Sequence, residues 1–86
     1  MLRITESSLS EHEMTLRLEG QVIGPWVKEL QRTCEQLLSS GCQITLDLNE
    51  VSFADLDGVS LLHSLQGRHV ALVNHSALLG EQLKGN

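Results

Sequence analysis

The stretch over residues 44–65, ITLDLNEVSFADLDGVSLLHSL, constrains the fold more than any other part of the chain. It opens with alternating apolar and polar side chains, which predict a half-buried strand. A loop with Asp55, Asp57 and Gly58 comes next, and leucines at helical spacing follow it. Two carboxylates therefore lie where a strand ends and a helix begins. The free N–H groups and positive dipole end of a helix attract acidic side chains at that place.

Apolar spacing and turn residues divide the rest of the chain into strands and helices. Alternating apolar and polar side chains predict strands over residues 2–5, 14–19, 42–48 and 69–73. Apolar residues at three- and four-residue intervals predict helices that begin at Pro25, at about Gly58 and at Ala77. The expected connections are a polar hairpin segment over residues 6–13 and loops over residues 20–24 and 49–57. Gly41 is expected to end the first helix in a left-handed conformation, and Ser76 to cap the last one.

The predicted order of elements, β-β-α-β-α-β-α, implies an α/β fold. Strands that alternate with helices indicate parallel strands joined by crossovers, which are almost always right-handed. Successive right-handed crossovers in one direction place their helices on the same face of the sheet. The other face is expected to be wet, because a parallel sheet covered on both faces shows continuous apolar runs instead of alternation. We therefore expect a two-layer sandwich, a mixed four-stranded sheet with helices packed mainly on one face.

The length and charge of the chain exclude several classes of function. With 86 residues, the chain is expected to form a single domain over residues 1–86. Its net charge is −5 and it has no run of basic residues, which argues against a nucleic-acid or anionic-membrane partner. No apolar stretch approaches the roughly 20 residues that cross a bilayer, and the N-terminus lacks the apolar region of a signal peptide. We expect a cytoplasmic protein without membrane insertion.

The histidines, cysteines and carboxylates are not spaced as a catalytic or metal site. Cys34 and Cys42 lack the CxxC spacing and are expected to be buried thiols. His69 and His75 lie at the two ends of one predicted strand, so they do not easily converge, although His75 alone can lie near Asp57. No Gly-rich phosphate loop accompanies the aspartates. The sequence therefore predicts no enzyme activity, no metal site and no cofactor.

Two runs of the chain resemble the STAS domain of anti-sigma-factor antagonists. They are LRLEGQVIGPWVKEL, residues 16–30, and LDLNEVSFADLDGVSLLHSL, residues 46–65. In that family, a strand ending in glycine precedes a helix, and a second strand leads through V-S-F-x-D into an acid-Ser-Ser/Thr-Gly turn. The resemblance implies a STAS-like fold and a regulatory, protein-interaction function. STAS domains of lipid-transport systems are similar too, so the implied partner is an anti-sigma-type regulator or a transporter subunit.

The turn that carries the phosphorylation switch of the family differs in this chain. Asp55 matches the acid and Gly58 matches the glycine, but Leu56 stands at the phosphoacceptor position and Asp57 at the position after it. Leu56 has no hydroxyl group, and Ser60 on the predicted helix is a poor substitute. No phosphorylation site is therefore expected.

The partner-binding surface is expected at the loops that follow the carboxyl ends of the strands, where open α/β sheets place their sites. Its predicted residues are Asp55, Leu56, Asp57, Gly58, Val59, Ile23 and Trp26. Two interpretations of Leu56 stay open, namely burial in the core or an exposed contact patch with Val59 and Ile23. Trp26 either caps the core or extends that patch. Asp57 is expected to be the N-cap of the helix, with or without a role as a fixed charge for a partner.

Two other classes of function stay open. One is a module that binds a small ligand, a nucleotide or a lipid, in a groove at the same edge of the sheet. The other is a homo-oligomer that associates through the open sheet face or an edge strand.

Overall fold

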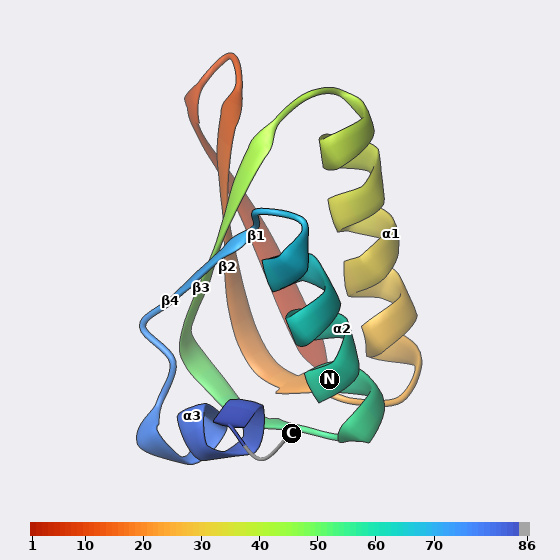
Figure 1. Ribbon diagram of the computed structural model, residues 1–86, viewed down its shortest axis with the longest axis vertical. Helices are drawn as coiled ribbons and strands as arrows, with labels where there is room; N and C mark the ends of the chain where they lie inside the picture. Colours follow the sequence, from red (N-terminus) through yellow and green to blue (C-terminus); the bar gives the residue numbers. More distant parts are fainter. Residues whose placement is uncertain (85–86) are drawn as a thin grey trace.

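The computed structural model describes residues 1–84 and has the predicted order of elements (Figure 1). The strands are β1 (Leu2–Ser10), β2 (Glu13–Val22), β3 (Gln43–Ala54) and β4 (Ala71–Val73). The helices are α1 (Pro25–Ser39), α2 (Leu56–Gly67) and α3 (Ala77–Lys84).

The strands form one mixed sheet in the order β1-β2-β3-β4. β1 and β2 pair antiparallel, whereas β2 pairs with β3, and β3 with β4, in parallel. The helices α1 and α2 are the two crossovers and lie side by side on one face of the sheet (Figure 1). The prediction of a two-layer α/β sandwich with a mixed four-stranded sheet is therefore confirmed.

The core lies between the sheet and the helices and is almost entirely aliphatic. The strands contribute Leu16, Leu18, Ile44, Leu46 and Leu48, and the helices contribute Leu30, Cys34, Leu62, Leu65 and Leu79. Among the described residues, no polar or charged residue is buried. Burial of apolar surface is thus the main force that holds the helices on the sheet.

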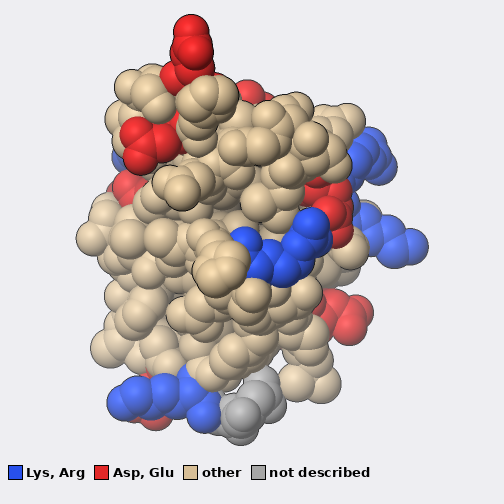
Figure 2. Space-filling view, turned by 45° about the horizontal axis from the view of Figure 1, so that its top comes forward, with Lys and Arg blue, Asp and Glu red and all other residues tan. Residues whose placement is uncertain are grey.

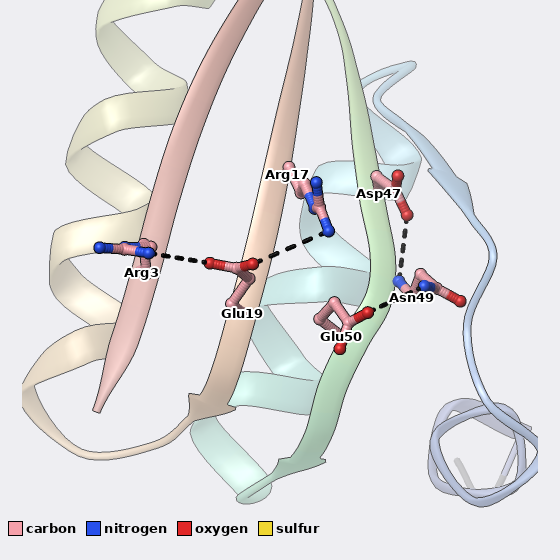
Figure 3. Close-up of polar contacts among 6 residues, drawn as sticks. All are labelled: Arg3, Arg17, Glu19, Asp47, Asn49 and Glu50. Atoms are coloured by element: carbon pink, nitrogen blue, oxygen red, sulfur yellow. Dashed lines mark hydrogen bonds and ion pairs between the residues drawn. The ribbon is translucent and has the colours of Figure 1, made fainter.

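The other face of the sheet carries polar side chains in contact with one another (Figure 3). Glu19 on β2 forms ion pairs with Arg3 at 3.7 Å and with Arg17 at 3.8 Å. On β3, the carboxylate of Asp47 accepts a hydrogen bond from the backbone N–H of Asn49 at 3.1 Å. Exposed pairs of this kind add little stability, but they show that this face is in contact with water, as predicted.

The predicted hairpin between the first two strands is present, but its connection is shorter than the expected residues 6–13. β1 continues to Ser10 and β2 begins at Glu13, with a register shift between Ser8 and Ser10 and only a tight turn between the strands. All side chains from Glu6 to Glu13 are exposed. A hairpin end without a buried side has no apolar alternation, so the sequence carried no strand pattern there.

The predicted loops over residues 20–24 and 49–57 are also too long, because β2 extends to Val22 and β3 to Ala54. Two register shifts interrupt the pairing of β2 with β3. They change the spacing of the buried side chains of β3 from every second residue to every third: Ile44, Leu46, Leu48, Val51 and Ala54. A bulge interrupts the alternation of apolar and polar side chains, so the part of a strand beyond it is not predicted from that pattern.

The ends of the helices largely follow the expected turn chemistry. Pro25 is the first residue of α1, and Gly41 after it has a φ of +83°, the left-handed region. The Oγ of Ser76 accepts the N–H of Leu79 at 3.1 Å, which caps α3 as predicted. β4 begins later than predicted, because His69 adopts a φ of +69° that is incompatible with a strand.

No helix within residues 1–84 is long and apolar enough to cross a membrane. On the face shown in Figure 2, basic side chains gather at the right edge, and others near the centre and at the lower left lie beside acidic ones. No single sign of charge dominates this face.

Candidate functional site

Asp55 joins the two loops at the carboxyl ends of β2 and β3. Its Oδ1 accepts the backbone N–H of Gly58 at 2.8 Å, so Asp55 is the N-cap of α2. Its Oδ2 accepts the backbone N–H of Gly24 at 2.9 Å, in the loop that leads into α1. One carboxylate therefore holds the starts of both helices together.

The charged form of this carboxylate is favoured. The N–H of Gly24, followed by that of Gly58, holds the pKa of Asp55 below its ordinary value. Its backbone is extended, with φ −81° and ψ −176°, which is the usual conformation of an N-cap. Asp55 thus places a fixed negative charge between the two loops at neutral pH.

Asp57 is not the N-cap, so that prediction is wrong. α2 starts at Leu56 instead of Gly58, which puts Asp57 inside the first helical turn. Its side chain is exposed, and it forms no ion pair among residues 1–84. The carboxylate near the positive end of the helix dipole still stabilises α2, and it remains free to contact another molecule.

Leu56 lies on the surface with 83% of its area exposed, so its burial in the core is excluded. Val59 is buried at 4% exposure, and Ile23 is only half-buried. The predicted patch of Leu56 with Val59 is therefore not formed, since Val59 belongs to the core. Trp26 is half-buried and packs against the core, which agrees with the interpretation that it caps the core.

Gly58, in the first turn of α2, lies against the backbone of β2. A Cβ atom at this position would overlap the carbonyl oxygen of Val22 and would lie 3.2 Å from the Cβ of Ala54. The same Val22 oxygen accepts the N–H of Asp55 at 3.2 Å. Only glycine allows the turn to lie this close to the sheet.

A groove of about 350 Å³ runs between α1 and α2, beside the turn. Its apolar lining residues, Val27 and Leu61, are each 8% exposed. The polar lining residues from α1 are Lys28 and Gln31, and those from α2 are Asp57, Ser60 and Ser64. Apart from Asp57, none of these residues was predicted from the sequence to belong to the site, although their three- and four-residue spacing places them on one face of each helix.

The histidines do not converge with Asp57. His63 and His75 line a second groove, of about 390 Å³, between α2 and α3. Among the described residues, no cluster of three or more metal-ligating side chains occurs. The imidazole pair therefore belongs to a region separate from the turn at residues 55–58.

Comparison with known proteins identifies the family. A family model described as "Mlab, STAS domain" matches residues 5–84. No curated protein matches the chain. Among solved structures, the anti-sigma factor antagonist SpoIIAA in its unphosphorylated form is similar with a TM-score of 0.77 and 15% identity, over 98% of this chain and 84% of that chain. At this identity the likeness shows the fold alone, and it agrees with the STAS fold that the sequence implied. The chain belongs to the STAS domain family that the Mlab model describes.

Proposed function

We propose that this STAS domain is a non-catalytic interaction module that binds a protein partner through the turn at Asp55, Leu56, Asp57 and Gly58. One observation carries the proposal: Leu56 exposes 83% of its area at the position where the family has its phosphoacceptor. A leucine exposed on a fixed turn and flanked by carboxylates fits the apolar anchor and polar rim of an interface. The Asp55 contacts support this by keeping the turn in place before a partner arrives.

The groove between α1 and α2 extends this surface. Lys28 and Asp57 line it from opposite helices, and neither forms an ion pair among residues 1–84. A partner segment that fits has an apolar side chain for Leu56 and a basic one for Asp57. Such charge complementarity mainly provides specificity and faster association.

The missing hydroxyl favours one class of partner. A kinase-type anti-sigma regulator would act on a Ser or Thr at the position of Leu56, and no such group is present. Binding to a partner that needs no phosphorylation, such as a subunit of a lipid transporter, fits this turn better. Regulation of the SpoIIAA type is the alternative, and it would have to work without modification of this position.

The test compares two leucines that are both on the surface. Leu56→Lys introduces a charge into the proposed surface, whereas Leu9→Lys does so at the far hairpin, where Leu9 is 68% exposed. Tagged wild-type and variant proteins are used to capture partners from the source cells, and circular dichroism checks the fold. We expect both variants to fold, and a protein retained by the wild type and Leu9→Lys to be lost with Leu56→Lys. A folded Leu56→Lys protein that still retains it would refute the proposal.

A further inference from the structure

Within residues 1–84, the end of β3 that leads into the turn has no neighbouring strand on the side of β4. β4 has three residues and pairs only with Thr45, Leu46 and Asp47 of β3. β3 continues to Ala54, where β2 still pairs with it on the other side. Backbone N–H and C=O groups beyond β4 therefore need other partners or water.

At Ala54, a side chain of α3 takes the place of the missing strand. The Nε2 of Gln82 donates to the carbonyl oxygen of Ala54 at 2.7 Å, and the Oε1 of Gln82 accepts the N–H of Ala54 at 3.4 Å. A side-chain amide carries the same donor and acceptor as a peptide group. Gln82 can thus satisfy both backbone groups of one residue, as a paired strand does.

The packing of α3 holds Gln82 in this position. α3 lies beside the end of β3 (Figure 1). Leu79 is fully buried and Leu83 packs against the core. Because Leu79, Gln82 and Leu83 are three and four residues apart, they share one face of α3.

Ala54 directly precedes Asp55, whose carboxylate holds Gly24 and Gly58. We propose that Gln82 is a positioning residue for the turn at residues 55–58, so that the geometry of this surface depends on the docking of α3. The side-chain amide fixes Ala54 from one side, and the Asp55 N–H to Val22 carbonyl bond fixes the next residue from the other. Release of Ala54 lets the end of β3 move and weakens the contacts of the Asp55 carboxylate. An effect of Gln82 on partner binding rests on the proposed function of this turn.

The test uses the whole chain and two variants of α3. Gln82→Met keeps the length and packing of the side chain but removes both hydrogen bonds to Ala54, and it adds no charge near Asp55. Glu81→Ala is the matched control, because the side chain of Glu81 is exposed and forms no hydrogen bond or ion pair among residues 1–84. Amide hydrogen exchange is measured by NMR, and the carboxyl carbon of Asp55 is titrated in the same samples.

In Gln82→Met, we expect the N–H groups of Gly24 and Gly58 to exchange roughly three- to tenfold faster with solvent. This is the factor by which loss of one ordinary hydrogen bond raises the population of the open state from which an amide exchanges. The pKa of Asp55 should rise toward its ordinary value, because its two N–H donors are held less firmly. The N–H of Val70, bound to the Leu65 carbonyl at 3.1 Å, reports on the far end of α2 and should not change. Glu81→Ala should match the wild type in all three measurements.

Three results would overturn the inference. If only the amides of α3 exchange faster, Gln82 stabilises α3 and does not position the turn. If Val70 changes by the same factor as Gly58, the effect is on global stability. If nothing changes at Gly24, Gly58 or the Asp55 carboxyl, the turn is held without Gln82. No partner is used, so the proposed function is tested separately by the two leucine variants.

Discussion

Gly58→Ala should destabilise the domain strongly, although alanine favours a helix. The added Cβ would overlap the carbonyl oxygen of Val22 and lie 3.2 Å from both the Cγ1 of Val22 and the Cβ of Ala54. Overpacking of this kind costs about 1–3 kcal/mol. We expect the upper end, because the overlapped atom belongs to the backbone of β2 and cannot rotate away. The helical preference for alanine returns about 0.5–1 kcal/mol, which leaves a net loss of about 2 kcal/mol.

The assay is urea unfolding followed by circular dichroism, with Gly67→Ala as the matched control in the same helix. Apart from its chain neighbours and the backbone of its own helix, no atom of residues 1–84 lies within 4 Å of a Cβ built at Gly67, so this variant should be neutral or more stable by up to about 1 kcal/mol. A net loss of about 2 kcal/mol in Gly58→Ala corresponds to a fall in Tm of about 8–16 °C for a domain of this size. A loss below about 0.5 kcal/mol would refute the close approach of the turn to β2 on which the site depends.

Two further predictions concern ionisable groups. Asp55→Ala should lower the urea midpoint more than Asp57→Ala, because the Asp55 carboxylate accepts two backbone N–H groups and the Asp57 carboxylate accepts none among residues 1–84. Equal effects would contradict the assignment of the cap. The pKa of Asp55 is lowered in the folded state, so the stability that its carboxylate contributes is present above the ordinary aspartate pKa and is lost as pH falls through the folded value. The urea midpoints of Asp55→Ala and Asp57→Ala should therefore converge in acid. Cys34 should resist Ellman's reagent in the native protein at mildly alkaline pH while half-buried Cys42 reacts, because burial raises the pKa of the Cys34 thiol to about 11. The stability that the protonated Cys34 thiol contributes is complete at neutral pH and is lost as pH rises through the folded pKa of about 11. Fast reaction of both thiols with Ellman's reagent would show instead that the core around α1 is open.

The parts of the fold that follow from sequence are those with an uninterrupted apolar period. Ile44, Leu46 and Leu48 alternate along β3 and are all buried, and the apolar face of α1 likewise points into the core. The end of β3 was missed because bulges against β2 shift the buried side chains to Val51 and Ala54. Such shifts depend on the partner strand, so the local sequence of one strand does not reveal them.

The candidate site shows the same division between local and distant causes. The sequence located the turn and its two aspartates, but both are good N-cap residues and either could begin the helix. Asp55 is selected because its second oxygen also accepts the N–H of Gly24, 31 residues away in sequence. The contact of Gln82 with Ala54 joins residues 28 apart and is equally invisible to local patterns.

These contacts also explain how the turn keeps its shape without a phosphoacceptor. In this chain the acid is needed for structure, because the Asp55 carboxylate caps α2 and joins it to the loop before α1. The glycine is needed as well, because β2 leaves no room for a Cβ at Gly58. Leu56, between them, has no contact in the core and 83% of its area in water, so its side chain is not fixed by the fold. The residue at this position can therefore be a leucine instead of a serine or threonine while the backbone of the turn stays the same, so the shape of the turn does not depend on a hydroxyl group at residue 56.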